Sequence, residues 1–519
     1  MPSERPLRPG RCGILAGGAA AVLAFAALVL PYWHPVYGFT AFLQLDHSYD
    51  ATKIAAFREY PVYVHPEAGP YDGIAYSQIA YHPLLRSPEL VRAVDNPAYR
   101  ARRILPSALA WLLAAGRPAL IVRIYSELNL AAWLVLAALL WRLLPVGDGR
   151  TLLVWIGILF SAGALASVRF ALTDLVALVP LAAGMALLER GRGGKAAGCL
   201  ALAALTRETS LLAVPGFWVR PARTAALRAL AAALPLALWL AYIRWAVGPT
   251  NAGSGNFGWP GAGFAAKWLE TLRMIRGESS GNPLLDAASA AALAGMTAQA
   301  AFLLLRPRFA DAWWRIGASY LALLLVLGPA VWAGYPGAAA RVLLPMTLAF
   351  NVLAGRRRAA LAWILAGNLG IVAGVASFCD PPPHPRQLAA VRADGGAWIV
   401  RTGSGWYETE RSWHGDRAWC RGDGRLEIQS WGADRRTVWL AFELRTIRPR
   451  TVALRQGGRE LWRGTLGSTW TRVEIPVETG SRSDPVDFST DAPPVSGPTA
   501  ADSRQLAFAL RGLHLRTIP

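Results

Sequence analysis

The sequence is poor in charged residues and in cysteine. Only 17% of its 519 residues are charged and 54% are hydrophobic, whereas an average soluble protein is about 25% charged. This balance argues against a soluble single-domain enzyme. The four cysteines lie far apart in the sequence, which excludes a disulfide-dense scaffold and a cysteine-based zinc site. Metal chemistry would therefore have to use carboxylates.

Lysine is almost absent. Lys53, Lys195 and Lys267 are the only lysines, so arginine carries nearly all of the positive charge behind the formal net charge of +20. The arginines fall between apolar runs of about 20 residues rather than in one patch, which argues against a nucleic-acid partner. Apolar runs of this length with basic residues between them are typical of a membrane protein.

Eleven apolar runs predict a mainly α-helical, polytopic membrane protein with about eleven transmembrane segments. The runs lie at 12–32, 119–140, 151–168, 171–188, 196–210, 211–219, 226–246, 286–305, 314–333, 342–355 and 359–378. The first run is long for a signal peptide and ends at the aromatic pair Tyr32–Trp33, which favours an uncleaved membrane anchor.

Arginine clusters predict the orientation. We let the runs alternate across the membrane and treat the short runs 196–210 and 211–219 as one pair. Five basic clusters then fall on the same side as the N-terminus, and the positive-inside rule makes that side cytoplasmic. Three segments then lie outside: the loop 33–118, the loop 247–285 and the chain after residue 379. The protein is therefore expected in a membrane, with its N-terminus in the cytoplasm and the chain after residue 379 on the extracytoplasmic side.

The tail, residues 380–519, differs in character from the preceding domain, residues 1–379. It follows a proline-rich linker at 381–385 and contains short strand-like runs separated by turn residues, which predicts an extracytoplasmic β-sandwich of the jelly-roll, carbohydrate-binding kind. Its eight tryptophans could pack between sheets or stack on sugars. Cys379 and Cys420 share the outer side, where they could form a disulfide or remain unpaired thiols.

The loop 33–118 holds acids first and arginines after them. Asp46, Asp50 and Asp72 precede Arg102 and Arg103. Carboxylates at a membrane surface can deprotonate a hydroxyl or bind a divalent cation, and arginines can hold a phosphate; a plain solvated loop is the alternative. Asp72 follows an aromatic residue and precedes a helical stretch, so we expect it at a helix N-terminus.

Further charged residues stand at the ends of apolar runs. Arg169 and Asp174 flank a short outer turn, as a salt bridge or as partners facing the outer cavity. Arg207 and Glu208 separate two half-runs, and interrupted segments often mark substrate sites, although a structural ion pair is the alternative. Arg341 begins the outer end of a late run, where it could contact a phosphate or snorkel to the interface.

Several of these segments resemble those of bacterial multi-spanning glycosyltransferases of the GT-C superfamily, over roughly residues 10–380. They are Tyr71–Gly73, Asp95–Arg100 with Arg102–Pro106, Thr173–Leu175 and Leu205–Glu208. The tail resembles, more loosely, the C-terminal β-domain of predicted-membrane members that carry a Gly-Trp-Tyr motif, here Gly405–Tyr407 with Glu410.

This resemblance implies transfer of a sugar from a polyprenyl-phosphate donor to a glycan or lipid-linked acceptor, with inversion, at the outer face of the membrane. It implies an acid of the first outer loop as base or metal anchor: Asp72, with Asp46 and Asp50 as alternatives. The expected phosphate-binding residues are Arg102, Arg103, Arg207 and Arg341, and the expected supporting residues are Tyr99, Arg169, Asp174 and Glu208.

No nucleotide-binding glycine loop follows a strand, so a nucleotide cofactor or nucleotide-sugar donor is not expected; whether Mg²⁺ or Mn²⁺ is needed stays open. Two other functions share most of these features: a non-enzymatic transporter or assembly protein for lipid-linked glycans, and a glycan polymerase or ligase. Charges gathered on one face favour an enzyme, because a transporter would need them along a path through the bilayer.

Overall fold

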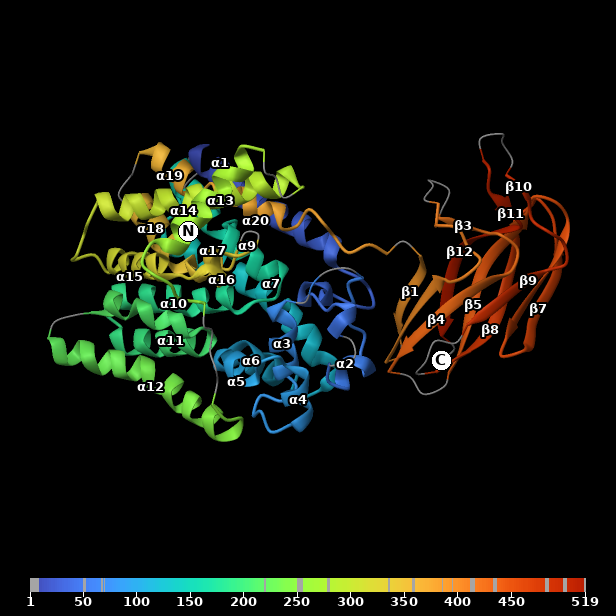
Figure 1. Cartoon of the computed structure of the whole chain (residues 1–519), viewed down its shortest axis with the longest axis horizontal. Helices are drawn as coiled ribbons and strands as arrows, with labels where there is room; N and C mark the ends of the chain where they lie inside the picture. Colours follow the sequence, from blue (N-terminus) through green and yellow to red (C-terminus); the bar gives the residue numbers. More distant parts are fainter. Residues whose placement is uncertain are drawn as a thin grey trace, which may run out of the picture. The chain divides into compact units, whose positions relative to one another are not determined.

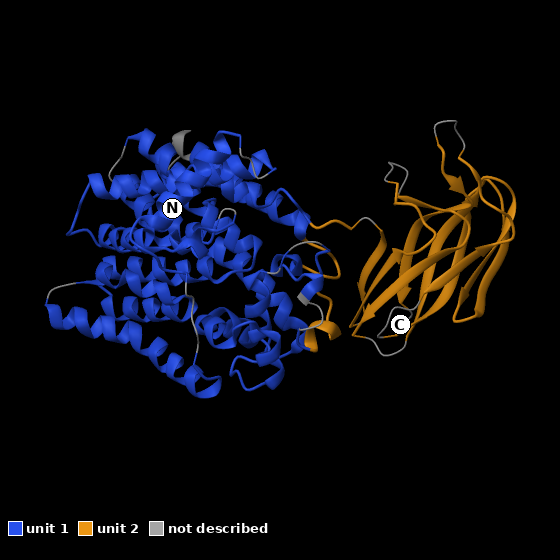
Figure 2. Ribbon diagram, viewed as in Figure 1, with its two compact units in different colours: residues 1–32, 39–54, 64–381 blue, residues 33–38, 55–63, 382–519 orange. Residues whose placement is uncertain are grey.

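The protein is described by a computed structural model. It describes the whole chain except residues 1–8, 50–52, 67–68, 70, 219–220, 250–254, 278–280, 335–336, 357–359, 385, 394, 411–415, 433–435, 481–484, 498–501 and 518–519. The chain forms two compact units (Figure 2). Unit 1 comprises Met1–Tyr32, Phe39–Ile54 and Val64–Pro381, and unit 2 comprises Trp33–Gly38, Ala55–Tyr63 and Pro382–Pro519.

Unit 1 is helical (Figure 1). Its longer helices are α1 (Pro9–Val29), α7 (Pro118–Leu143), α8 (Gly149–Leu159), α9 (Ala162–Arg169), α10 (Thr173–Glu189), α11 (Gly193–Thr206), α12 (Ala222–Ala246), α13 (Ala262–Ile275), α14 (Pro283–Leu305), α15 (Ala312–Val326) and α18 (Leu344–Arg356). Shorter elements are η5 (Glu208–Phe217), α16 (Pro329–Trp332), α17 (Ala339–Val342), α19 (Leu361–Gly367) and α20 (Ile371–Ala376).

The expectation of about eleven membrane spans is wrong. Each predicted run is largely helical, but among the described residues only α1 (extended to Tyr32), α7, α12 and α14 are long and apolar enough to cross a membrane, or five segments if α8 and α9, bent by 42°, form one span. Crossing a bilayer takes about 20 residues. The other runs form short helices or break, as the run 314–333 does between α15 and α16.

In unit 1 the loop 33–118 folds into a layer of short helices. These are α3 (Asp72–Ile79), α4 (Pro88–Ala93), α5 (Pro97–Arg100), η4 (Ala101–Arg103) and α6 (Ile104–Leu113), whereas α2 (Ala56–Glu59) belongs to unit 2. Ile79, Leu90 and Ile104 from this layer pack with Ile243 of α12 in one buried apolar cluster. The charged residues of the loop therefore stand on a packed support.

Unit 2 contains two antiparallel sheets. The six-stranded sheet has the order β1-β2-β4-β9-β6-β7 and the four-stranded sheet β3-β12-β5-β8, and β10 pairs with β11. The strands are β1 (Gln387–Ala393), β2 (Gly396–Thr402), β3 (Arg417–Cys420), β4 (Gly424–Trp431), β5 (Arg436–Thr446), β6 (Arg450–Gln456), β7 (Arg459–Leu466), β8 (Thr471–Thr479), β9 (Val486–Thr490), β10 (Val495–Ser496), β11 (Gln505–Leu506) and β12 (Phe508–Thr517). Inward-facing residues of both large sheets, such as Trp398, Phe442 and Phe488, form one core.

Cys379 lies in unit 1 and Cys420 in unit 2, so the disulfide considered between them stays a prediction. Cys379 is exposed and Cys420 is buried. Cys420 points inward from β3 into the core of unit 2, and burial raises the pKa of its thiol to about 12. Cys420 therefore acts as a small core residue.

Two stretches of the first loop, 33–38 and 55–63, belong to unit 2. The Arg401 guanidinium of β2 donates to the Tyr37 hydroxyl at 2.6 Å, and Arg392 of β1 donates to the Val36 carbonyl at 2.8 Å. Tyr37 also packs edge-on against Trp431 of β4. All three contacts attach the stretch 33–38 to the six-stranded sheet.

Candidate functional site

Asp72 is the first residue of α3, as its sequence context predicted. A carboxylate is favoured there by the free N–H groups of the first turn. Gly73 brings this turn against the chain between α9 and α10, because a Cβ atom at Gly73 would lie 2.4 Å from the Phe170 carbonyl oxygen. The close approach fixes where the Asp72 side chain can point.

Arg100 holds Asp72 to one side. Its Nη1 lies 2.6 Å from Asp72 Oδ1, while its Nε and Nη2 form a bidentate pair with Asp95 at 3.0 and 2.8 Å. Within the part of the chain that the structure describes, no group donates to Asp72 Oδ2. Burial raises the pKa of Asp72, but neighbouring arginines, Arg100 foremost, outweigh it and keep the pKa below its ordinary value. The carboxylate is thus ionised at neutral pH, with one oxygen free to accept.

A small pocket opens beside Asp72. It is lined by residues of α3 and of the segment from α4 to α5, among them Tyr71, Gln78 and Val94. Its polar groups are carboxylates, an amide and the Arg100 guanidinium, a set that can hydrogen-bond to several hydroxyl groups at once.

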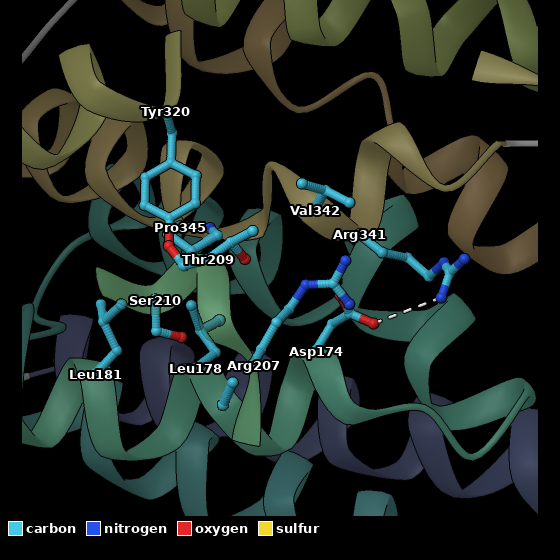
Figure 3. A pocket seen from close by; sticks show the side chains of 11 residues that line it. Asp174, Leu178, Leu181, Arg207, Thr209, Ser210, Tyr320, Arg341, Val342 and Pro345 are labelled. Carbon is cyan, nitrogen blue, oxygen red and sulfur yellow. Dashed lines mark hydrogen bonds and ion pairs between the residues drawn. The ribbon is translucent and has the colours of Figure 1, made fainter. Parts of the chain in front are cut away.

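Two arginines approach a second carboxylate, Asp174, from two sides (Figure 3). Arg207 forms an ion pair with Asp174 Oδ1, and Arg341 Nη1 lies 3.5 Å from Oδ2. All three side chains are at least nine-tenths buried. Two cations share one anion, so this group carries a net positive charge. It borders a second, narrow pocket that is also lined by Thr209, Ser210 and Tyr320.

Helix ends and short elements position Asp174, Arg207 and Arg341. Arg207 stands in extended conformation between α11 and η5, at the interruption that the sequence predicted, and Asp174 lies in the first turn of α10. Arg341 belongs to the short helix α17, which packs tightly on α9, because a Cβ atom at Gly163 would lie 2.3 Å from the Ala340 carbonyl oxygen.

Tyr71 links the two pockets. It lines the pocket beside Asp72, and its hydroxyl accepts a hydrogen bond from Arg341 Nη2 at 3.0 Å. The Arg341 guanidinium also lies over the Tyr71 ring, 5.3 Å from its centroid. The ionised Asp72 and the arginine pair are therefore neighbours in one site.

A second ion pair supports this site. Arg103 forms a bidentate pair with Glu208 at 3.0 and 3.1 Å and donates to the Tyr76 hydroxyl at 2.6 Å. Through these hydrogen bonds Arg103 connects α3 with η5. Arg102 lies over the Tyr99 ring at 5.4 Å and keeps a buried Nε without a hydrogen-bond partner in the described chain.

Two sequence candidates, Asp46 and Arg169, stand apart from the site. Asp46 caps its own turn, accepting a hydrogen bond from the Ser48 N–H at 2.7 Å, and its backbone bridges to His65. Asp50 lies outside the described residues. Arg169 is buried against the rings of Tyr32 and Phe170. It therefore anchors helices, and among the described ion pairs none joins it to Asp174.

Sequence reasoning did not assign roles to Tyr71, Asp95 or Arg100. Each lies inside a segment that carries the family resemblance, but nothing local shows that Arg100 turns toward Asp72, 28 positions earlier. Asn256, in the loop 247–285, also reaches the site and donates to the Tyr99 hydroxyl at 3.4 Å. Among the described residues no group of three or more His, Cys, Asp or Glu side chains comes together as metal ligands would.

Comparison with known proteins gives only distant likenesses. No protein-family model and no curated protein matches the chain. Among solved structures, the chain is similar to arabinosyltransferase EmbB from Mycobacterium smegmatis. The identity is 11%, the match covers 99% of this chain and 66% of that one, and the TM-score is 0.24. The chain thus spans about two thirds of the length of EmbB.

Two carbohydrate-binding modules are similar to a smaller part of the chain, the C-terminal β region. One is a mutant of CBM29-2, a family 29 module, with 12% identity over 25% of this chain and 88% of the module and a TM-score of 0.17. The other is CBM6cm-2 from Cellvibrio mixtus lichenase 5A, in complex with cellotriose, with 10% identity over 26% of this chain and 99% of the module and a TM-score of 0.16. Values this low assign no function, so function has to be argued from the site.

Proposed function

We propose that the chain is a membrane glycosyltransferase of the GT-C type that transfers a sugar from a polyprenyl-phosphate donor to a glycan or lipid-linked acceptor. The observation that carries this proposal is the pairing of an ionised acid, Asp72, with the buried cationic group formed by Arg207, Arg341 and Asp174. An acid that can take a proton and a cationic group that can hold a phosphate are the two parts that such a transfer needs.

In the proposed reaction the acceptor hydroxyl enters the pocket beside Asp72 and hydrogen-bonds to Oδ2. Its oxygen attacks the anomeric carbon, and the bond from that carbon to the phosphate oxygen breaks. The hydroxyl proton passes to Asp72, and polyprenyl phosphate leaves with the bonding electron pair. Arg207 and Arg341 stabilise its charge, because a guanidinium has five N–H groups and Asp174 engages only some of them.

The reaction is proposed to take place at the extracytoplasmic face of a bacterial cytoplasmic membrane, with unit 2 holding the acceptor glycan. Support for the orientation comes from the positive-inside rule applied to the arginine clusters between the apolar runs. If a divalent cation takes part, the carboxylates of Asp72 and Asp95 are the nearest oxygen ligands, and the ion would bind the donor phosphate.

The test is an assay of the purified full chain in nanodiscs with a panel of polyprenyl-phosphate pentoses and hexoses. Mass spectrometry should detect free polyprenyl phosphate together with a glycosylated acceptor. Donor that crosses a sealed proteoliposome membrane intact, with no release of polyprenyl phosphate, would contradict the proposal and favour a transporter. Transfer of preassembled oligosaccharides but not of single sugars would indicate a polymerase or ligase.

A further inference from the structure

The outer face of the four-stranded sheet in unit 2 carries alternating guanidinium groups and aromatic rings. Along β3, β12 and β5, side chains alternate between the core of unit 2 and the outer face of the sheet. Trp419, Ala509 and Arg445 face outward and lie next to one another in register. Arg445 lies over the rings of Trp419, at 5.5 Å, and Trp470, at 4.6 Å. Arg511 lies over Trp470 at 4.3 Å.

Arg445 differs from the other arginines of this face in its partners. Arg511 pairs with Glu443 at 2.6 Å, and Arg417 pairs with Glu410 at 2.6 Å. Arg445 has no ion pair or hydrogen bond to its side chain in the described chain, and its Nε is buried. Its guanidinium lies over two indole rings. The charge of the Glu410 carboxylate acts on it, but that carboxylate is paired with Arg417 and Arg504.

Arg445 stands among carboxylates that already have partners. Burial and the positive charges of Arg417 and Arg511 lower the pKa of Arg445, and the negative charge of Glu410 opposes them; an arginine stays protonated at neutral pH. A bound anion would give Arg445 the ion-pair partner that Glu410 and Glu443 provide for Arg417 and Arg511.

We infer that this face binds an acidic glycan, with a carboxylate of the sugar seated on the N–H edge of Arg445. The preformed planar fork of arginine matches a carboxylate in bidentate geometry. Among the described residues 387–517, no large hydrophobic side chain stands exposed, so the sheet offers no apolar anchor for a bilayer or a typical protein interface. The choice of a saccharide as the carrier of the anion rests on the proposed function.

The test is binding of the full chain in detergent to polygalacturonate, a polymer of uronic acid, with the carboxyl-reduced neutral polymer as the comparison. We expect binding to the acidic polymer only. Arg445→Gln should weaken it about 10- to 100-fold, the range for loss of a hydrogen bond to a charged group. Arg472→Gln, which removes a charge paired with Glu474 on the same face, should change it less than about twofold.

Arg445→Lys, which keeps the charge but not the stacked fork, should weaken binding less than Arg445→Gln and also serves if the glutamine variant does not fold. Equal losses in Arg445→Gln and Arg472→Gln, or equal binding of the neutral polymer, would overturn the inference. Binding to vesicles with anionic phospholipid, but not to polygalacturonate, would assign the site to lipid headgroups instead. The sugar-transfer assay does not enter this experiment, so either proposal can fail alone.

Discussion

Asp72 and Asp174 are two carboxylates with different surroundings and hence different proposed roles. Asp72 keeps one oxygen free beside a pocket, whereas Asp174 is buried between two guanidinium groups. The first can take part in proton transfer. The second holds the arginines in place and limits the cost of burying two positive charges together.

At the residue scale we expect Asp72→Asn to lower the rate of sugar transfer about 10²- to 10⁴-fold, the usual contribution of a general base, with little change in the donor KM. Asp46→Asn should leave the rate unchanged, because Asp46 only caps its own turn. The measurement is the rate of sugar transfer from radiolabelled donor in the two variants. Loss of activity in Asp46→Asn with full activity in Asp72→Asn would reverse the assignment.

The arginine pair should respond differently. Arg341→Gln removes a donor to the leaving phosphate, so we expect kcat/KM for the donor to fall about 10²- to 10³-fold, as when one oxyanion-binding group is removed. Arg123→Gln, a matched change at an exposed residue of α7, should have no effect. A normal kcat/KM in Arg341→Gln would exclude Arg341 from phosphate binding.

At the element scale, glycines set the positions of the charged residues. Gly73→Ala would place a Cβ atom 2.4 Å from the Phe170 carbonyl oxygen, so the start of α3 has to move. A displacement of about 1 Å can cost about 10²-fold in rate. Gly198→Ala in α11 has no neighbour within 4 Å and should keep activity and gain up to about 1 kcal/mol of stability.

The test is to measure the rate of sugar transfer and the thermal unfolding of the Gly73→Ala and Gly198→Ala variants. Unchanged activity in Gly73→Ala would mean that the contact between α3 and the α9–α10 turn does not position Asp72.

The elements show how far sequence reasoning reaches. Apolar runs predicted where helices lie, and the Arg207–Glu208 interruption predicted the break between α11 and η5, because both are local signals. The number of spans was overestimated, since composition does not show where a helix bends or stops. The Arg100–Asp72 pair and the paired role of Arg103 depend on tertiary packing that no local pattern carries.

At the scale of the whole molecule, two stretches of the first loop belong to the β unit, a grouping that sequence order conceals. His34 is a buried contact of this grouping. Its Nδ1 accepts from the backbone N–H groups of Val36 and Tyr37, so its Nε2 carries the hydrogen and donates to Gln387 Oε1 at 2.9 Å. Protonation of Nδ1 would break both backbone contacts.

This contact predicts a pH dependence. Burial lowers the pKa of His34 to about 4, with further lowering by nearby His384 and Arg401. Well above pH 6.5 the ring is neutral in both the folded and the unfolded chain, so this group gives stability no pH dependence there. As pH falls from 6.5 to 4, His34 is protonated in the unfolded chain before it is protonated in the folded one. The free energy of unfolding therefore falls by up to about 3 kcal/mol.

Hydrogen exchange of residues 34–38 should therefore speed up between pH 6.5 and 4, after correction for the intrinsic exchange rate. His34→Gln should remove that dependence, and His514→Asn, at an exposed position of β12, should preserve it. The same pH dependence in His34→Gln would show that another group is responsible.

The most direct test of the central claim is a structure of the full chain with a non-hydrolysable polyprenyl-phosphonate sugar. The account predicts phosphonate oxygens within about 3 Å of Arg207 and Arg341, and the anomeric carbon on the side of Asp72. A phosphonate bound elsewhere, with the Arg207–Asp174–Arg341 group unchanged, would contradict it.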